Sequence, residues 1–581
     1  MKKNKLIYIL LIALAALGCK KDFLVRQPLS NLAPTTFFRD ANDLMLYTNS
    51  FYDAMIPSAQ SLGYGEFDDN AAATGLSSEV RGTRTVPTTG GGWDWGTLRK
   101  INFYLDNSYK CGDEAARKKY DGVARFFRAW FYFTKVQRFG DVPWYSHTIE
   151  ANDEANLTKP RDSRVLVMDS VLADIDYAIA NLDTKKSIDR VSKWTALALK
   201  SRICLFEGTF RKYHTEFNLP GADKFLDECI SASEALINQS GYKLYTSTPS
   251  KAYLELFASH SAIATEVILA RTFNPSIQVT HDLNRYTNSA SFGQPGVVKT
   301  VVNSYLMKDG SRFTDIPGYD TMQFYTETQN RDPRLSQTIR TPGYTRIGET
   351  KKLVPSFAAS LTGYQYIKSV TESAYDPVNL SFNDLPVFRY AETLLNFAEA
   401  KAERGTLTQA DLDKSIKLLR DRVGMPNMSL SSANANPDPY LAAQYTQVSS
   451  ANKGVILEIR RERRIELIRE NFRWNDLMRW KEGHLVTIPF KGMYFPGLGS
   501  YDLDKDGVVD VVLYEGTKPS QPGPQYLKLG SEITLENGKN GGNIIANSGI
   551  TKKFDETKDY LYPIPIQELL LNEHLKQNPG W

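Results

Sequence analysis

The sequence predicts a mostly α-helical protein, with helix pairs forming a scaffold, one loop-rich irregular face and a few short strands. Long amphipathic stretches recur in both halves of the chain, with apolar residues at helical spacing. Small residues recur where successive predicted helices would cross, which favours close helix pairs. Residues 241–384 have no strong helical period and are rich in Ser, Thr, Pro and aromatic residues, so they predict long loops with short strands.

The N-terminus has the order of a secretory signal peptide, which we expect to span residues 1–18. Lysines come first, an apolar run from Leu6 to Leu17 follows, and small residues lead directly to Cys19. The apolar run is too short to cross a bilayer, which needs about 20 helical residues. A signal that ends at a cysteine resembles the lipobox of bacterial lipoproteins, with Ala16 where the usual box has Leu. The resemblance implies that Cys19 carries lipid; an ordinary signal with an incidental cysteine is the alternative.

The composition is that of a large globular protein. The 581 residues are 42% hydrophobic and 23% charged, with 12% aromatic residues and a formal net charge of +4. No long basic run is present, so the sequence does not indicate nucleic-acid binding. No stretch after the signal is apolar enough to span a membrane. We therefore expect attachment to a membrane through Cys19 alone.

Helices are expected throughout the N-terminal half after the signal. Residues 120–139 are apolar on most of the helical circumference, so this helix should be buried between others. In the helix over residues 193–212, Ser201 and Gly208 alternate with bulky residues and would let a neighbouring backbone approach. This alternation, in helices joined by short turns, loosely resembles a tetratricopeptide repeat. The expected helices span residues 37–55, 98–107, 120–139, 164–182, 193–212 and 222–238.

The C-terminal half is expected to return to helices after the loop region. A second tetratricopeptide-like pair is predicted over residues 393–404 and 409–423, each ended by a glycine. Residues 429–452 are rich in Ser, Ala and Asn and predict a loop of low order. The longest helix is predicted over residues 455–480. The chain then ends in an extended run, a one-turn helix and Trp581, which favours a tail packed against the protein.

Acidic and basic residues alternate along the predicted helix over residues 455–480. One interpretation of this pattern is an anion-binding site. The other is a paired, partly buried structural network, which the interleaved acids favour. At a spacing of three residues, three pairs can form on one helix face: Arg463 with Glu466, Glu466 with Arg469, and Glu470 with Arg473.

An acidic stretch near the C-terminus has the spacing of a calcium-binding loop. Aspartates stand at alternate positions before Gly507, and hard carboxylate ligands with a glycine at the sharp turn suit Ca²⁺. The twelfth position, where an EF-hand places Glu, is Leu513, so the loop is not an EF-hand. We expect no required cofactor; this loop holds either a structural calcium ion or is a solvated acidic turn. The predicted ligands are Asp502, Asp504, Asp506 and Asp510.

The cysteines and histidines do not indicate a metal or catalytic centre. Cys111, Cys204 and Cys229 form no C-x-x-C pair, and the 6 histidines are not at metal-ligand spacing. Cys204 and Cys229 lie in predicted helices, where they would be buried thiols or, in an exported protein, a disulfide. No G-x-S-x-G, H-E-x-x-H or nucleotide-binding glycine loop is present, so we do not expect an enzyme.

Aromatic residues on the long loops are the candidates for ligand binding. Sugars present apolar C–H faces and hydroxyl groups, which flat aromatic rings beside polar groups can bind. The loop over residues 63–95 is rich in Gly and Thr, and Gly90-Gly91-Gly92 ends regular structure there. The alternative for each aromatic residue is packing in the core or in a protein interface. The first candidates are Tyr64, Phe67, Trp93 and Trp95, and the second are Tyr286, Tyr319 and Tyr325.

A series of short motifs follows along the whole mature chain. They are Cys19-Lys20-Lys21-Asp22-Phe23-Leu24, residues 124–129 with Phe139-Gly140-Asp141-Val142-Pro143, Arg331-Asp332-Pro333-Arg334, residues 389–400, residues 462–467 with Asp476-Leu477-Met478-Arg479-Trp480, and Tyr562-Pro563-Ile564-Pro565 with Gln577-Asn578-Pro579-Gly580-Trp581. In this order they resemble the SusD/RagB-like family of nutrient-uptake outer-membrane lipoproteins. Two departures leave the expected fold unchanged: the terminal Trp581, where Tyr or Phe is usual, and Asn471-Phe472-Arg473, where Gly is common before the arginine.

The resemblance implies a helical fold whose N-terminal region (19–240) and C-terminal region (241–581) pack as one globular unit. It implies a surface lipoprotein at the outer membrane that forms a lid on a SusC-like TonB-dependent transporter. Such a lid captures a nutrient, an oligosaccharide or a peptide, and delivers it inward. Two other functions stay open: a surface glycoside hydrolase with a pair of carboxylates, and a scaffold lipoprotein that binds no nutrient.

Overall fold

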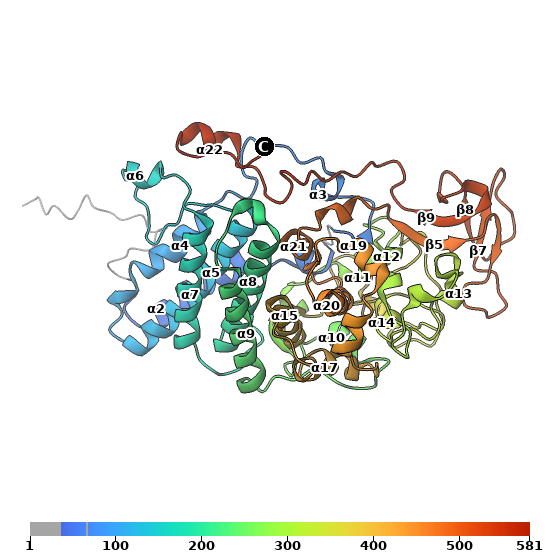
Figure 1. Cartoon of the computed structure of the whole chain (residues 1–581), viewed down its shortest axis with the longest axis horizontal. Helices are drawn as coiled ribbons and strands as arrows, with labels where there is room; N and C mark the ends of the chain where they lie inside the picture. The colour runs from blue at the N-terminus through green and yellow to red at the C-terminus, as the bar shows by residue number, and fades with distance from the viewer. Residues whose placement is uncertain (1–36, 65–67) are drawn as a thin grey trace, which may run out of the picture.

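The computed structural model describes residues 37–64 and 68–581. It contains 44% helix and 9% strand, with the strands in small sheets, which confirms the predicted mostly helical fold. Long helices of the N-terminal half lie at one end of the molecule and the strands β5 to β9 at the other (Figure 1). The signal peptide, Cys19 and Phe67 lie outside the described residues.

The predicted N-terminal helices are present, with their ends moved by a few residues. The helix expected over residues 120–139 starts earlier, because the Asp113 side chain accepts a hydrogen bond from the Ala116 amide and caps the first turn. Neighbouring helices pack in pairs, α5 against α7 and α8 against α9 (Figure 1). The helices are α2 (Ala41–Met55), α4 (Gly96–Leu105), α5 (Glu114–Phe139), α7 (Arg164–Asn181), α8 (Lys193–Tyr213) and α9 (Ala222–Gln239).

Small residues set the close approach of α8 and α9, as predicted. A Cβ atom at Gly208 would lie 2.9 Å from Leu226 Cδ2 and 3.0 Å from the Leu226 backbone nitrogen. About two turns before Gly208 on α8, the hydroxyl groups of Ser201 and Ser233 lie 2.9 Å apart across the same interface. Glycine at position 208 therefore lets the two backbones meet at a distance that a larger residue would not allow.

The loop region lies between two strands that pair with each other. β2 (Val267–Arg271) is antiparallel to β4 (Leu385–Arg389). Arg271, where the long connection begins, is therefore paired with Leu385, where the connection ends. The predicted long loops are present, but they also contain short helices that the sequence did not indicate. These are α11 (Leu283–Asn288), α12 (Lys299–Ser304), α13 (Phe324–Glu327) and α14 (Leu335–Thr338); α10 (Ala252–Ala258) precedes β2.

The second predicted helix pair is less regular than expected. α15 (Tyr390–Arg404) agrees with the prediction, but its partner is divided into α16 (Gln409–Asp413) and α17 (Ile416–Arg422). The predicted loop over residues 429–452 contains two short helices, α18 (Leu430–Ala435) and α19 (Pro439–Gln444). Ser429 and Asp438 cap these two helices with their side-chain oxygens. Ser and Asp favour helix N-termini as well as loops, so the polar composition of this stretch did not distinguish the two.

The predicted long helix over residues 455–480 is wrong. The chain instead forms α20 (Lys453–Glu466) and α21 (Arg473–Arg479), and the longest described helix is α5 with 26 residues. Between α20 and α21, Arg469 and Asn471 have φ angles of 61° and 62°. This left-handed backbone is incompatible with a continuing α-helix, so the chain turns there and aims α21 in a new direction.

The strands near the C-terminus form two small sheets. β5 (Lys491–Phe495) pairs with β9 (Gly542–Ile545) in an antiparallel ladder. β6 (Gly499–Tyr501) is antiparallel to β7 (Val511–Tyr514), which is parallel to β8 (Gln525–Lys528). The acidic stretch predicted as a calcium loop connects β6 to β7.

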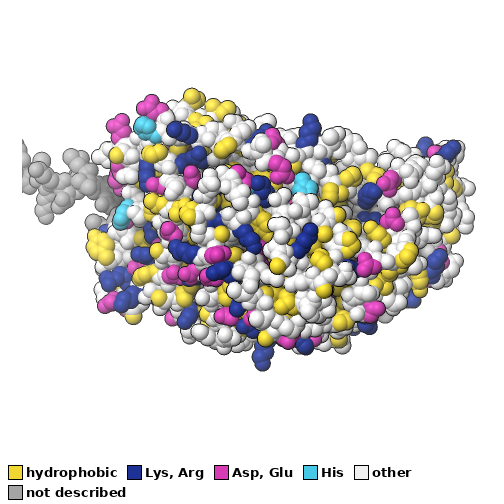
Figure 2. Space-filling model, viewed as in Figure 1, with side chains coloured by type: hydrophobic (Ala, Val, Ile, Leu, Met, Phe, Trp, Pro, Cys, Tyr) yellow, Lys and Arg dark blue, Asp and Glu magenta, His cyan; other side chains and the backbone are white. Residues whose placement is uncertain are grey.

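One hydrophobic core joins both halves of the chain. It extends from Phe38 through α5, α8 and α15 to Ile564 near the C-terminus. No helix among the described residues is long and apolar enough to cross a membrane. On the face in Figure 2, Lys and Arg side chains alternate with Asp and Glu, without a large area of one sign.

The C-terminal tail is packed down, as predicted, through backbone and amide contacts. The amides of Ile566 and Gln567 donate to Pro87 O and Thr88 O at 3.0 Å, and Asn578 Nδ2 donates to Phe139 O at 3.0 Å. These bonds hold α22 (Ile566–Leu571) beside α4, yet Leu570 and Leu571 are 80% and 69% exposed. Hydrophobic side chains accordingly show over α22 in Figure 2.

Candidate functional site

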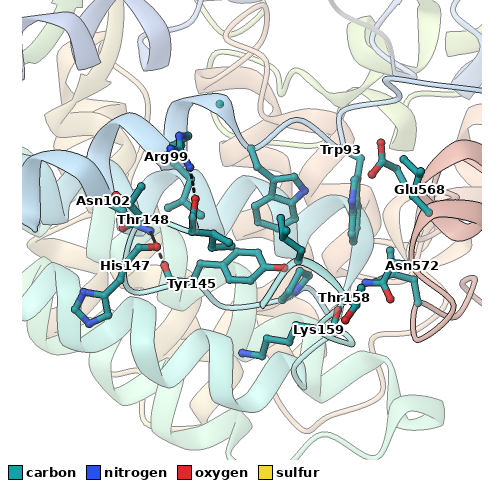
Figure 3. A pocket seen from close by; sticks show the side chains of 18 residues that line it. Trp93, Arg99, Asn102, Tyr145, His147, Thr148, Thr158, Lys159, Glu568 and Asn572 are labelled. Atoms are coloured by element: carbon teal, nitrogen blue, oxygen red, sulfur yellow. Dashed lines mark hydrogen bonds between the residues drawn. The ribbon is translucent and has the colours of Figure 1, made fainter. Parts of the chain in front are cut away.

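A cavity of about 520 Å³ opens beside α4, and its lining contains Trp93 and Trp95, two of the four residues that were the first candidates from the sequence. We call it the Trp95 pocket. The start of α4 and the segment 143–149 form its walls, residues 157–159 at the end of α6 (Glu154–Leu157) form its floor, and the C-terminal tail closes one side (Figure 3). Its principal lining residues are Trp93, Trp95, Arg99, Tyr145, His147, Lys159, Glu568, Leu571 and Asn572.

Trp95 and Tyr145 present the aromatic surface of the Trp95 pocket. Their rings meet edge to face, with centroids 5.8 Å apart and planes at 84°. Both are half-buried, whereas Trp93 is only 6% exposed and packs edge-on against Trp95 and Phe139. Trp95 and Tyr145 can therefore contact a ligand, and Trp93 mainly supports Trp95 from behind.

The glycine loop before α4 fixes Trp93 and Trp95 in place. Gly90, Gly91 and Gly92 have φ angles of 71°, 57° and 88°, a backbone conformation that residues with a Cβ atom rarely adopt. This backbone turns carbonyl groups toward α5. Lys135 Nζ lies 2.5 Å from Gly92 O and from Asp94 O, and Arg138 Nε donates to Gly91 O at 2.8 Å.

A chain of buried polar contacts positions the wall that carries Tyr145. Asn102 on α4 donates through Nδ2 to Tyr145 O at 2.9 Å and to His147 O at 3.1 Å (Figure 3). Its Oδ1 accepts from Arg128 on α5 at 3.1 Å. Arg128 in turn forms a bidentate pair with Asp174 on α7, at 2.6 and 2.8 Å. Three helices thus hold one extended wall by charge-assisted bonds.

The polar rim of the Trp95 pocket contains groups that could bind hydroxyls. Arg99 donates to Ile149 O, and Lys159 pairs with Asp162 at 2.6 Å. The Glu568 carboxylate has no hydrogen-bond partner within the described part of the chain, and it faces Trp93 in Figure 3. Burial raises the pKa of Tyr145 to about 12, so its hydroxyl stays protonated and donates to Asn156 O at 3.2 Å.

The other aromatic candidates lie away from the Trp95 pocket. Tyr64 stacks on Tyr286 with centroids 5.0 Å apart, and Phe292 meets both rings edge-on. Tyr319 contacts Phe313 and Tyr440 instead. The structure therefore brings together Trp93 with Trp95, and Tyr64 with Tyr286. Tyr319 and Tyr325 join neither pair, and Phe67 lies outside the described residues.

Two of the ion pairs predicted within the helix over residues 455–480, Arg463 with Glu466 and Glu470 with Arg473, are wrong, because these four charges pair with other elements. Glu466 accepts from Arg334, Arg389 and Arg422. Arg463 pairs with Asp476 at 2.8 Å, Glu470 with Lys368 and Arg389 at 2.6 Å, and Arg473 with Asp69 at 2.6 Å. These groups are buried and matched by opposite charges, as the structural-network interpretation expects.

Three of the predicted metal ligands lie together in the β6–β7 connection. Asp502, Asp504 and Asp510 offer carboxylate oxygens within 4.8 Å of one another, whereas Asp506 does not join them. Burial and the neighbouring aspartates raise the pKa of Asp510, as expected where like charges crowd. Such an oxygen set could bind a hard cation. Calcium binding stays a prediction.

All three described cysteines are buried free thiols, so no Cys204–Cys229 disulfide is formed. Burial raises the pKa of Cys229 to about 12, and Ser201 and Ser233 lie beside its sulfur. These residues behave as small core side chains.

Sequence reasoning missed several residues of the Trp95 pocket. Tyr145, Arg99, Lys159 and Glu568 come from four segments that only the tertiary fold brings together. One signal was present: Trp144-Tyr145 follows directly after the Gly-Asp-Val-Pro stop of α5, where a chain turning back toward α4 would place an aromatic residue.

Comparison with known proteins gives the family. Residues 265–581 match the SusD family, and residues 91–198 match a family described as starch-binding and associating with the outer membrane. "SusD-like protein P38" of Formosa agariphila is 24% identical over 85% of this chain and 95% of its own length, and "SusD-like protein P2" is 23% identical over the full length of both.

Solved structures share the fold. A SusD-like protein from Bacteroides fragilis aligns with a TM-score of 0.69 and 20% identity, over 96% of this chain and 100% of that one. A SusD-like carbohydrate-binding protein from the same species aligns with a TM-score of 0.67 and 22% identity, over 93% and 100%. SusD-family proteins are binding proteins without catalytic activity, which confirms that the chain is not an enzyme. The match over more than half of the chain shows that this protein belongs to the SusD family.

Proposed function

We propose that this protein binds an oligosaccharide in the Trp95 pocket and passes it to a SusC-like TonB-dependent transporter. The protein would be held at the outer membrane by lipid on Cys19, with the pocket on the extracellular side. The observation that carries the proposal is the half-exposed pair Trp95 and Tyr145, set nearly at right angles in a pocket whose lining also holds the Glu568 carboxylate, which has no hydrogen-bond partner among the described residues.

The chemistry of the Trp95 pocket suits a sugar. The ring of Trp95 offers a flat apolar surface for the C–H face of a pyranose, and Tyr145 closes one edge. Glu568 and Arg99 lie at the rim, where equatorial hydroxyl groups would emerge. A laminarin-binding SusD-like protein has the same fold, with a TM-score of 0.53 and 18% identity, which supports a saccharide before a peptide.

Calorimetric titration of the mature chain with a panel of oligosaccharides tests the ligand, with Trp95→Ala as the diagnostic variant. One face of an indole covers about 60 Å² of apolar area, worth about 1.5 kcal/mol, so affinity should fall about tenfold. Tyr109→Ala is the matched control, because Tyr109 is 66% exposed and does not line the pocket. Unchanged affinity in Trp95→Ala, or binding of peptides alone, would refute the assignment.

Fractionation of the producing cells tests the location and the partner. We expect mass spectrometry to find an acylated Cys19, and Cys19→Ala to release the protein from the membrane. A transporter should co-purify with the acylated form in mild detergent. Release of shortened glycan products would favour a hydrolase instead, and co-purification without saccharide binding would favour a scaffold.

Ligand binding by Tyr64 and Tyr286, as a second aromatic surface, stays a prediction. The rings of Tyr64 and Tyr286 are stacked, and the Phe292 ring meets both of them edge-on. The Arg285 guanidinium lies 5.1 Å from the Phe292 ring centroid. A Cβ at Gly293 would lie 2.1 Å from Tyr286, so the glycine permits this packing. Tyr286→Ala should weaken binding only if a long oligosaccharide reaches this cluster as well.

A further inference from the structure

A second cavity, of about 650 Å³, lies on the other side of the glycine loop from the Trp95 pocket. It is formed by α3 (Ser78–Arg81), the C-terminal end of α5 and the start of α21. It shares no lining residue with the Trp95 pocket. We call it the Trp474 pocket, and nothing in the proposed function assigns it a role.

Trp474 is placed in this cavity by the break between α20 and α21. The left-handed turn at Asn471, with φ of 62°, redirects the chain so that Asn471, Trp474 and Asn475 line one wall. Trp474 is half-buried. It is the one tryptophan of the described chain with neither an aromatic neighbour nor a cation over its ring. Trp474 packs against the hydrophobic core and also lines the cavity, so part of its ring is available to a ligand.

Amide side chains beside Trp474 have unused hydrogen-bonding capacity. Gln137, Asn471 and Asn475 line the cavity, and their side chains make no hydrogen bond within residues 37–64 and 68–581. Amides of this kind can both donate to and accept from hydroxyl groups. The Trp474 pocket therefore combines a ring surface with polar groups, which is the combination that sugars require.

Two cations of α5 distinguish this pocket from an ordinary sugar site. Lys135 and Arg138 line it, and neither lies within 4.0 Å of a carboxylate in the described chain. The glycine loop supplies carbonyl oxygens to Lys135 Nζ and Arg138 Nε, but it does not neutralise their charge. Arg138 also lies over the Tyr562 ring, 3.6 Å from its centroid, which fixes the guanidinium plane.

The single carboxylate on the pocket lining is already engaged. Glu79 accepts hydrogen bonds from Tyr562 Oη at 3.1 Å and from Ser78 Oγ at 3.1 Å. The lining thus carries two positive groups against one negative group. Arginines such as Arg334, Arg389 and Arg479 have carboxylate partners at 3.0 Å or less, whereas the buried Arg331, like Arg138, is bonded to carbonyl oxygens. Arg138 differs from such a buried arginine because it lines an open cavity, where an external anion can reach the guanidinium.

We propose that the Trp474 pocket binds an acidic sugar residue, with its carboxylate on the Arg138 guanidinium and its ring face on Trp474. The planar guanidinium matches a carboxylate in geometry, and the indole matches the C–H face that a uronic acid shares with neutral sugars. This inference rests on the proposed function, because it takes the ligand to be a saccharide, and it adds the class: an oligosaccharide containing uronic acid.

Titration calorimetry on the mature chain tests this proposal with oligouronides of galacturonate, glucuronate, mannuronate and guluronate. Each is compared with its carboxyl-reduced neutral counterpart. We expect at least one oligouronide to bind tenfold or more tightly than its neutral counterpart. Arg138→Gln should remove that difference, Arg138→Lys should keep part of it, and Trp474→Ala should weaken the acidic ligand tenfold or more.

Lys118→Gln is the charge-matched control on the same helix. Lys118 is exposed and about 30 Å along α5 from Arg138, at 1.5 Å per residue, so its loss should leave the preference unchanged. The melting temperature of each variant confirms that it is folded.

The outcomes separate this inference from the proposed function. If neutral oligosaccharides bind in a Trp95-dependent way and no oligouronide binds more tightly than its neutral counterpart, the proposed function stands and this inference is wrong. A preference for acid that survives both Arg138→Gln and Trp474→Ala also overturns it. If no saccharide binds, both fail.

Discussion

Glu466→Gln should lower the free energy of unfolding by about 3–5 kcal/mol, the usual cost of breaking a buried ion pair. Oε1 of Glu466 accepts from Arg389 at 2.8 Å and from Arg422 at 2.7 Å. Oε2 accepts from Arg422 at 2.6 Å and from Arg334 at 3.2 Å. Glutamine removes the charge and turns donor hydrogens toward guanidinium groups. A loss of about 1 kcal/mol for each of these contacts gives the same total.

The same residue predicts a pH dependence. Burial alone would raise the pKa of Glu466, but Arg422, Arg389 and Arg334 outweigh it and hold the pKa well below its usual range. A depressed pKa contributes stability that is complete above the unfolded value of about 4.3 and is lost as the pH falls toward the folded value. The difference between native protein and variant should therefore be constant from pH 5 to 8 and shrink below about pH 4.

Urea unfolding followed by far-ultraviolet circular dichroism measures both effects. Glu573→Gln is the control, because Glu573 is exposed and forms no ion pair in the described chain, and it should change stability by less than about 0.5 kcal/mol. Two results would show that the buried charges are not mutually stabilising. One is a decrease in the free energy of unfolding of less than about 1 kcal/mol in Glu466→Gln. The other is a decrease that stays the same below about pH 4.

Three further perturbations test the remaining assignments. Calcium should raise the melting temperature of the native protein and not of Asp504→Asn; equal responses would exclude a site between β6 and β7. Cys204 and Cys229 should react with a thiol reagent only after unfolding, and a reductant that lowers the melting temperature would contradict free thiols. Gly208→Val should cost about 1–3 kcal/mol in urea unfolding, because its side chain would meet Leu226 at 2.9 Å or less; a neutral result would mean that α8 and α9 can separate.

Helical periodicity was sufficient for the long N-terminal helices and failed where tertiary contacts override it. α7, α8 and α9 each agree with their predicted ranges to within a residue. The region around Arg469 keeps a helical charge pattern, yet Arg469 Nε donates to Gly63 O at 2.9 Å and Nη1 to Lys368 O at 2.9 Å. These acceptors lie far away in the sequence, so no local pattern could have indicated the break.

The candidate site divides in the same way. Trp93 and Trp95 could be predicted because they follow a run of glycines on a long loop, where aromatic residues are candidates for ligand binding. Tyr145, Glu568 and Trp474 could not, because each reaches its pocket from another segment. Trp474 was expected within one long helix over residues 455–480. After the break before α21, its half-buried ring lines the Trp474 pocket.

The glycine loop is the element that relates the two pockets. Gly92 lines the Trp474 pocket, and the next residue, Trp93, lines the Trp95 pocket. A Cβ at Gly92 would lie 2.7 Å from Arg138 Nε, so a side chain there must displace the guanidinium. The displaced Arg138 would release Gly91 O, and the loop that holds Trp95 would lose one of its bonds to α5. The two pockets are therefore joined through a single stretch of backbone, whose position depends on the bond between Arg138 and Gly91 O.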